Sequence, residues 1–460
     1  MQKTITNKIR LTLPAIIFFI IGLFVLQVQH KWKRNQVLKW DAFGYHSYLP
    51  SLLIYKDWKK VSFLDSILTN YEPSGNKTHR FGFNPVAKTG NVCNQYTMGV
   101  AMMHAPGFAI AHGYSKWFSS FPADGYSFHY QKANAYTNLL YASLGILLLT
   151  FFLSTYFSST ISAITTILMG FGTNLLYYSY HFSGLSHPCL FFLYAAILYL
   201  TQTWYLKPSW LKTFGIGLCV GLCVLIRPID VLVVLIPLLW PHKNKLTFWL
   251  NHWKHIVAIA LLVLLVCLPQ LFYWKSVTGS WLYYSYNKEV DYFDFSKPHI
   301  IQGLLSYQNG WFVYTPLVLV AIAAAFAMGN NTFEKKYNWV LFVFFIPYIY
   351  LVFSWHDWFY GWSYGCRALI QTLPLLAFPL AWYIQHLASK QRLQKTIASA
   401  CFGFILFLNI FQSWQFEKGI LLGSLMNEKY YWSVFLSTHK DPKLDRILYL
   451  QQQMESEFGW

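Results

Sequence analysis

The chain has 460 residues, of which 55% are hydrophobic and 20% aromatic, whereas only 11% are charged. A soluble fold of this size cannot bury so much apolar surface, so lipid must form part of the solvent. The net charge of +18 would indicate a nucleic-acid partner in a soluble protein, but here many basic residues flank apolar runs, as membrane topology requires. The composition therefore predicts an all-α integral membrane protein and argues against a nucleic-acid partner.

An apolar stretch near the N-terminus is predicted to be the first membrane span. Lys3, Lys8 and Arg10 precede the run 11–28. This run is longer than the core of a signal peptide, and no small-residue cleavage site follows it. We expect the span to be retained, with its N-terminal end in the cytoplasm.

Ten more apolar runs follow, which makes about eleven predicted spans in total. They lie near residues 134–157, 160–180, 188–205, 213–226, 229–241, 255–274, 311–328, 338–354, 367–386 and 396–413. Alternating these runs from a cytoplasmic N-terminus places the lysine-rich connections in the cytoplasm, as the positive-inside rule requires. All Asp and Glu residues except Glu334 then lie at or beyond the outer boundary. The chain thus divides into a polytopic transferase-like domain, 1–413, and an external C-terminal tail, 414–460.

The first external segment, about 30–133, is predicted to carry short interfacial helices rather than another span. The stretch 96–114 is apolar, but counting it as a span would invert every later loop and place the lysines outside. It is therefore predicted to be interfacial or re-entrant. Apolar residues at helical spacing over 61–68 predict a helix lying on the membrane surface.

The same segment opens with Trp40 and Asp41 directly after the first span. If a helix begins at Asp41, then Asp41, Tyr45 and Tyr48 share one of its faces. One interpretation is a general base beside an aromatic surface that binds sugar. The other is an ordinary aspartate N-cap above tyrosines of the membrane interface, and the residues alone leave both open.

Two short apolar runs meet at the turn 225–230. Each run is about 20 Å long as a helix, against a hydrocarbon core of about 30 Å, so the turn should lie below the outer surface. Arg227 would then sit within the membrane and need a partner. Asp230 could form an ion pair with it, or an anionic ligand such as a lipid phosphate could bind there; the sequence leaves both open.

Two further outer connections, 181–187 and 355–367, gather histidines, aromatic residues and Arg367. No external carboxylate is spaced with these histidines in a zinc or iron pattern, so we predict no metal site. The tryptophans and tyrosines are also typical of the aromatic belt at a membrane interface. Arg367 begins an apolar run on the outer side, where the positive-inside rule disfavours it, which indicates an anionic partner.

Taken in order, these motifs give the chain its resemblance to a known family. It resembles the GT-C superfamily of membrane glycosyltransferases, which includes protein mannosyltransferases and the aminoarabinose transferase of lipid A. The resemblance covers most of the chain. It rests on the loop opened by Asp41, on 94–99 followed by Pro106, on 225–228, and more diffusely on 172–174 with 186–187, on 314–316 and on 362–367.

The resemblance implies an inverting transfer of a sugar from a polyprenyl-phosphate donor to a glycan, lipid or protein acceptor. The reaction would take place on the external, periplasmic face of the bacterial inner membrane, with surrounding membrane lipids as further partners. Asp41 matches the family's catalytic acidic residue and would accept the acceptor's proton, while Arg227, Arg367 and His187 would bind the donor phosphate. The expected substrate-binding residues are Tyr45, His46, Tyr96 and Trp358. No second acidic residue lies within two positions of Asp41, so no cofactor is predicted and dependence on a divalent metal is in doubt.

Two other functions remain as alternatives. A polymerase or ligase for lipid-linked polysaccharides also uses external arginines and histidines, although we do not expect it to carry the early loop opened by Asp41. A transporter or flippase also has many spans and charges within the membrane. The sequence shows no internal repeat and no matched pair of helices broken by glycine or proline, which disfavours the transporter.

Overall fold

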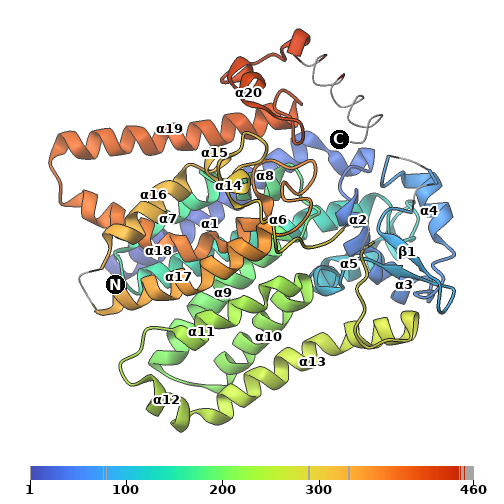
Figure 1. Ribbon diagram of the computed structural model, residues 1–460, viewed down its shortest axis with the longest axis horizontal. Coiled ribbons are helices and arrows are strands. Elements are labelled where there is room, and N and C mark those ends of the chain that lie inside the picture. Colours follow the sequence, from blue (N-terminus) through green and yellow to red (C-terminus); the bar gives the residue numbers. More distant parts are fainter. Residues whose placement is uncertain are drawn as a thin grey trace.

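The computed structural model describes residues 2–75, 77–78, 80–287, 291–329, 332–444, 446 and 450. These residues are mostly helical, with one small two-stranded sheet (Figure 1). The prediction of a predominantly helical chain is confirmed, whereas the sheet was not predicted. The end of the predicted tail, 451–460, lies outside the described residues.

Seven segments of the described chain are long and apolar enough to cross a membrane. They are built on α1 (Gln2–Gln29), α6 (Phe128–Ser154), α9 (His187–Leu206), α13 (Trp253–Thr278), α17 (Thr332–Phe353), the 3-10 helix η3 (Arg367–Thr372) with α18 (Leu373–Ala388), and α19 (Arg392–Glu417). Each coincides with an apolar run expected from the sequence. Hydropathy finds these segments because a span must present apolar side chains over nearly its whole length.

Four shorter apolar helices coincide with the remaining predicted runs. They are α7 (Ser159–Phe171), α10 (Trp210–Ile226), η2 with α11 (Pro228–Val234 and Leu235–Leu239), and α16 (Leu317–Ala327). The turn between α10 and η2 follows from Pro228, because proline favours the first position of a helix and disfavours helical geometry in the residue before it. Further short helices are η1 (Lys31–Arg34), α8 (Leu175–Tyr180), α12 (Lys245–Asn251), α14 (Ile300–Leu305), α15 (Trp311–Tyr314) and α20 (Glu428–Val434).

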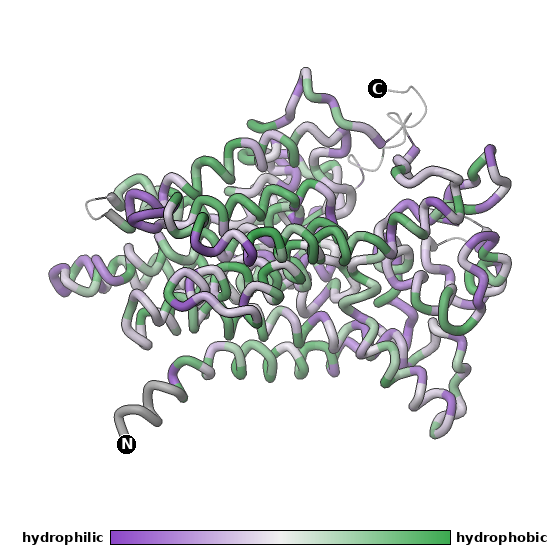
Figure 2. Tube along the Cα trace, turned by 90° about the horizontal axis from the view of Figure 1, so that it is seen from below, coloured by the Kyte–Doolittle hydropathy of each residue, from purple (hydrophilic) through white to green (hydrophobic). Residues whose placement is uncertain are grey.

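The long helices divide into a central and a peripheral set. In the candidate spans of α9 and α18, 72% and 78% of the most apolar window is buried, against 17% in α13 and 22% in α19. Hydrophobic residues follow the middle of the helices and hydrophilic residues gather toward the ends (Figure 2). The peripheral helices therefore expose apolar faces of the kind that lipid covers.

The connections sort to two ends of the bundle. The N-terminal end of α1, α12 and the connection between α18 and α19 lie at one end, and α2 to α5 with the sheet lie at the other (Figure 1). These three segments, all expected in the cytoplasm, thus share one end.

The segment that was expected to be external, about 30–133, contributes a compact cap at one end of the bundle. Its elements are α2 (Asp41–His46), α3 (Tyr48–Leu53), α4 (Leu64–Tyr71), β1 (Phe83–Val86), β2 (Asn91–Asn94) and α5 (Gly99–Phe118). The strands pair antiparallel, with Phe83 opposite Asn94 and Val86 opposite Asn91. Although α5 has 20 residues, it is not among the candidate spans of the described chain.

The helix predicted over 61–68 begins three residues further along the chain, at Leu64, as α4. Its role also differs from the prediction. Its apolar residues Leu64, Ile67 and Leu68 are buried in a small core with Phe43 and Phe83, not laid on a membrane surface. A short amphipathic helix gives the same pattern in both cases, because the pattern records only that one face is buried. The prediction of a surface helix was wrong.

Candidate functional site

A cavity of about 1400 Å³ lies between this cap and the helix bundle. Six of the eight residues that the sequence singled out for catalysis or binding line it. They are Asp41, Tyr45, Tyr96, His187, Arg227 and Arg367. These residues come from the cap, from the start of α9, from the α10–η2 turn and from the start of η3, so the fold joins segments that are far apart in the chain.

Asp41 is the first residue of α2, and each of its carboxylate oxygens has a partner. The Tyr96 hydroxyl donates to Oδ1 over 2.7 Å, and Arg367 Nη1 lies 3.0 Å from Oδ2. The side chains of Arg367 and Asp41 are 17% and 20% exposed, so this ion pair is partly shielded from water. Burial and the nearby Asp41 carboxylate raise the pKa of Tyr96 well above its ordinary value, which keeps this hydroxyl protonated and able to donate.

The backbone before Asp41 has an unusual conformation. Trp40 has φ 50° and ψ −127°, a region that residues other than glycine seldom adopt. Its ring packs edge-on against Phe81, with 5.2 Å between centroids. Strained backbone of this kind persists only where surrounding contacts hold it, and it gathers at functional sites. Here it reverses the chain so that α2 begins at the cavity wall.

The predicted face of Asp41, Tyr45 and Tyr48 forms only in part. Because α2 ends at His46, Tyr48 belongs to α3, and its hydroxyl donates to the Tyr96 carbonyl oxygen over 2.6 Å. Asp41 and Tyr45 line the cavity, and the Tyr45 ring lies 4.7 Å from the Tyr96 ring. Burial raises the pKa of Tyr45 to about 12, so it too stays protonated at neutral pH.

Gly44 sets the position of the Tyr96 ring. A Cβ atom at Gly44 would lie 2.2 Å from a carbon of that ring, so only glycine allows this approach. The carbonyl oxygen of Gly44 accepts from Asn94 Nδ2 over 2.7 Å, and Asn94 Oδ1 accepts from the Tyr96 backbone N–H over 3.1 Å. The motif 94–99 therefore holds Tyr96 against α2.

The motif 94–99 also packs against the turn that carries Arg227. The Thr97 hydroxyl donates to the Ile226 carbonyl oxygen over 3.1 Å. A Cβ atom at Gly99 would lie 2.7 Å from the Ile226 backbone nitrogen, so the two backbones approach closely there. Two motifs separated by about 130 residues thus form one wall.

Arg227 lines the cavity and forms no ion pair with any other residue that the structure describes. Its guanidinium carbon lies 5.6 Å from the centre of the Tyr360 ring, and Nη1 makes a long contact of 3.5 Å with the Ala368 carbonyl oxygen. Asp230 and Arg227 are both described, and the salt bridges of the described chain do not include this pair. The structural ion pair considered from the sequence is therefore not formed.

Asp230 instead accepts hydrogen bonds from two tyrosines inside the bundle. Its Oδ1 lies 2.7 Å from the Tyr194 hydroxyl and 2.6 Å from the Tyr348 hydroxyl. Gln371 Nε2 donates in turn to the Tyr348 oxygen over 2.6 Å. This network connects α9, η2, α17 and η3 behind the cavity wall.

His187 and Arg367 come from segments that pack on each other. The Tyr364 backbone N–H donates to the Tyr178 hydroxyl over 3.0 Å, and the His187 ring lies 5.3 Å from the Tyr178 ring. His187 Nδ1 is buried and has no hydrogen-bond partner. His187 as a whole lines the cavity, close to Gln371 of η3.

Two of the described residues expected to bind substrate lie outside the cavity lining. His46 is buried in the cap, where Nε2 donates to the Gly125 carbonyl oxygen over 2.6 Å, and burial lowers its pKa to about 4. Trp358 packs against His299, with 5.9 Å between ring centres. The aromatic residues that line the cavity from the segment 355–367 are Trp355, Tyr360 and Trp362. The direction of each side chain depends on local turns that the sequence did not reveal.

The sequence also left two carboxylates of the cavity unassigned. Asp291 and Asp357 both line it, and burial raises the pKa of each above its ordinary value. Asp357 Oδ1 is buried without a hydrogen-bond partner. Asp357 lies in the same polar segment as Arg367, which was a usable signal, whereas nothing in the sequence around Asp291 distinguished it.

Comparisons with known proteins add no assignment. No family model and no curated protein matches this sequence. The functional interpretation of the chain therefore rests on the geometry of the cavity. Within the described part of the chain, no three His, Cys, Asp or Glu side chains are grouped so that they could hold a metal ion, and all seven cysteines are free.

Proposed function

We propose that this chain is an inverting glycosyltransferase that moves a sugar from a polyprenyl-phosphate donor to an acceptor at the outer membrane boundary. One observation supports this most strongly: a single cavity holds the Asp41 carboxylate beside Arg367, with Arg227 and His187 in the same lining. A base and several groups that neutralise negative charge are what transfer from a sugar phosphate requires.

The proposed reaction is a single displacement at the anomeric carbon. The acceptor hydroxyl oxygen attacks this carbon, and its proton passes to an oxygen of Asp41. The bond from the anomeric carbon to the phosphate oxygen breaks on the opposite side, and the polyprenyl phosphate leaves with the electron pair. Arg227 and Arg367 neutralise the charge that develops on the leaving phosphate. No step of the proposal requires a metal ion.

Arg367 has to exchange partners for this reaction to proceed. Without donor it lies 3.0 Å from Asp41 Oδ2. The donor phosphodiester carries one negative charge, like the carboxylate, and it accepts bidentate hydrogen bonds from arginine, so it competes for the guanidinium. The leaving phosphate gains a second charge as its bond to the sugar breaks, which favours this exchange further. In the proposed cycle, donor binding moves Arg367 toward the phosphate and frees Oδ2 to receive the proton. Tyr96 keeps its bond to Oδ1 and fixes the carboxylate meanwhile.

The other cavity residues fit the sugar and the acceptor. Aromatic rings of Tyr45, Tyr286 and Tyr360 line the cavity and offer flat apolar surfaces, and Asp291 and Asp357 offer carboxylate oxygens as acceptors for hydroxyl groups. Ligand sites commonly combine many apolar groups with a few convergent polar ones. Sugar rings have the matching chemistry, with apolar C–H faces and a rim of hydroxyl groups.

We also propose that the four shorter apolar helices cross the membrane, which gives eleven spans. Short spans are tolerated where neighbouring helices cover their ends and where water fills an adjoining cavity. This topology places the N-terminus in the cytoplasm and the cavity and C-terminal tail outside, in a bacterial inner membrane. A cysteine at Ser296 should then react with an impermeant reagent in intact spheroplasts, and one at Asn244 only after lysis. The opposite labelling pattern would refute this orientation.

A comparison of cell-envelope glycans tests the proposed activity whichever sugar is transferred. A strain that lacks the gene is complemented with the wild-type protein, with Asp41→Asn, or with Asp65→Asn as a matched control, because Asp65 pairs with Arg80 on an exposed surface. Mass spectrometry should show one sugar modification that is lost in the deletion, restored by wild type and Asp65→Asn, and absent with Asp41→Asn. Full restoration by Asp41→Asn at equal protein level would contradict the proposal. Substrate uptake without any change in glycans would support a transporter instead.

A further inference from the structure

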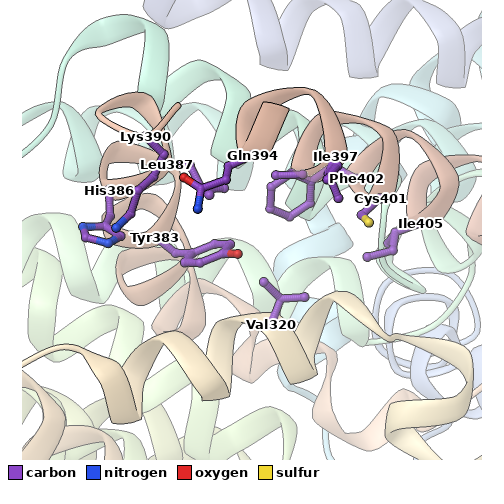
Figure 3. Close-up of a pocket in the computed structure, with 11 residues that line it drawn as sticks. Val320, Tyr383, His386, Leu387, Lys390, Gln394, Ile397, Cys401, Phe402 and Ile405 are labelled. Atoms are coloured by element: carbon purple, nitrogen blue, oxygen red, sulfur yellow. The ribbon is translucent and has the colours of Figure 1, made fainter. Parts of the chain in front are cut away.

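A second hollow, of about 460 Å³, opens at the opposite end of the bundle from the cavity, between α16, α18 and α19 (Figure 3). One wall is formed by Tyr383, His386, Leu387 and Lys390 at the end of α18, and the other by Gln394, Ile397, Ala398, Cys401, Phe402 and Ile405 on α19. Within each wall the residues follow the repeat i, i+3, i+4, i+7, so each wall is one face of a helix or its direct continuation. Val320 of α16 forms the floor.

The groove is polar at one end and apolar at the other. Figure 3 shows His386, Lys390 and Gln394 together at the polar end, while Cys401 and Ile405 lie farther along α19. Seven residues separate Gln394 from Cys401, which corresponds to about 10 Å along a helix. The groove therefore pairs a basic, hydrogen-bonding mouth with an apolar channel along the helices.

The anchoring of α19 explains why this groove exists. Asn409 Nδ2 donates to the carbonyl oxygens of Phe171 and Thr173, each over 2.8 Å, and Glu417 forms an ion pair with Lys31 over 2.8 Å. All these contacts lie in the C-terminal half of α19. In the N-terminal half, Leu393 and Ile397 are 69% and 55% exposed. Apolar surface of this kind within a membrane helix is covered by lipid where protein does not cover it.

We propose that the groove binds one membrane phospholipid with an anionic headgroup. Its phosphate lies at Lys390, with His386 and Gln394 as further hydrogen-bonding partners, and one acyl chain follows the face of Ile397, Cys401 and Ile405. The charge fits such an occupant, because Lys390, Arg392 and Lys395 are all exposed here and none belongs to an ion pair of the described residues.

This site is separate from the Asp41 cavity and does not depend on the proposed transferase activity. The proposed topology sets only the leaflet from which the lipid enters, which is the cytoplasmic one. A bound acyl chain would fill the space beside α19 and supply van der Waals contacts that the groove does not otherwise provide. The occupant is thus a structural lipid that supports the N-terminal half of α19.

Cys401 supplies a natural reporter, because it lines the groove and is exposed, whereas the other cysteines are buried or half-buried. Purified protein is placed in nanodiscs of phosphatidylcholine, with or without phosphatidylglycerol, and the alkylation of Cys401 by a small permeant maleimide is followed by mass spectrometry. Phosphatidylglycerol should slow alkylation about fivefold, the factor expected for one lysine that attracts an anionic lipid. Cys401→Ser identifies the labelled site.

The control variants separate a specific site from general attraction to the membrane. Lys390→Gln should abolish the protection, whereas Lys243→Gln, in the connection before α12, should retain it. Native mass spectrometry should show phosphatidylglycerol retained on wild type and on Lys243→Gln but lost from Lys390→Gln. Equal alkylation in both lipid compositions, or protection that survives Lys390→Gln, would overturn the proposal.

Discussion

Asp41 and Asp230 are both acidic residues held by tyrosine hydroxyls, but their surroundings differ. Asp41 lies in the cavity lining, 20% exposed, with Arg367 at 3.0 Å on the oxygen that Tyr96 leaves free. Asp230 is fully buried among helices and receives both of its hydroxyl partners on one oxygen. One carboxylate has a partly exposed arginine beside it, and the other has only neutral hydroxyl donors. We take this difference to separate a site that can react from one that connects helices.

The comparison also shows why Arg227 and Arg367 are not equivalent. Arg367 is held by an acidic partner that a ligand has to displace, whereas Arg227 has an aromatic face and one long carbonyl contact. In the proposed cycle, Arg227 therefore attracts the phosphate first, and Arg367 follows by leaving Asp41. Asp230 interacts electrostatically with Arg227 but forms no ion pair with it, so the guanidinium can still bind a phosphate.

The largest expected effect concerns turnover. Asp41→Asn should lower sugar transfer by about a hundredfold or more, because the amide cannot accept the proton, while folding stays intact. Asp230→Asn keeps the shape of the side chain and should retain most turnover. Transfer by purified protein, with the organism's own lipid extract as donor, measures both. Equal losses in the two variants would remove the distinction between the carboxylates.

The order should reverse when stability is measured. Asp230→Ala removes the acceptor to which the hydroxyls of Tyr194 and Tyr348 donate in the bundle and should cost about 2 to 4 kcal/mol of unfolding free energy. Asp41→Ala breaks a partly exposed ion pair and should cost about 1 kcal/mol or less. Denaturation in detergent followed by tryptophan fluorescence gives both values. A larger loss for Asp41→Ala would mean that its ion pair is mainly structural.

A smaller effect is expected when the Tyr96 ring is displaced. Gly44→Ala introduces a Cβ atom into the ring and should lower kcat about tenfold with little change in KM, because the carboxylate loses its orientation. Gly403→Ala is the matched control, since nothing lies within 4 Å of a Cβ atom there. If kcat is unchanged in Gly44→Ala, Tyr96 does not position Asp41.

The smallest effect concerns the pH dependence of stability at Asp357. Burial raises its pKa, so the folded protein keeps this proton where the unfolded chain has lost it. The stability linked to that proton is present at low pH and is lost as pH rises through the folded pKa. Asp357→Asn should therefore raise Tm slightly at about pH 7 and leave it unchanged at about pH 4. An identical shift at both values would exclude titration as the cause.

The sequence predicted the helices and much of the cavity for different physical reasons. A span is a local property, so hydropathy alone located every long apolar helix. Asp41, Arg227 and Arg367 stood out because charges near apolar runs are costly and need partners. Their pairing was not predictable, because it depends on how η3 packs against the cap. For the same reason, the sequence analysis assigned Arg367 to the donor phosphate and Asp41 to the acceptor's proton without indicating that the two side chains form an ion pair.

The failures come from short elements in the cap. Because α2 ends at His46 and Tyr48 belongs to α3, Tyr48 does not line the cavity with Asp41 and Tyr45. The hairpin 83–94 has too few residues for a clear alternating pattern. His46 was expected to bind substrate together with Tyr45, but a helix turns adjacent side chains to different faces, and His46 bonds to Gly125 inside the cap. Each failure involved a direction that only tertiary contacts determine.

The most direct test of the central claim is the affinity for undecaprenyl phosphate, measured on purified protein by native mass spectrometry or thermal shift. Arg367→Gln should weaken binding by about 2 to 5 kcal/mol. Asp41→Asn should strengthen binding roughly twofold to fivefold, because Arg367 no longer has to leave a carboxylate. This gain should exceed that of Asp291→Asn, which removes a cavity carboxylate that forms no ion pair with the described residues, and it should vanish when Arg367→Gln is also present. Unchanged or weaker binding by Asp41→Asn, or a gain that persists without Arg367, would contradict the competition between Asp41 and the donor phosphate.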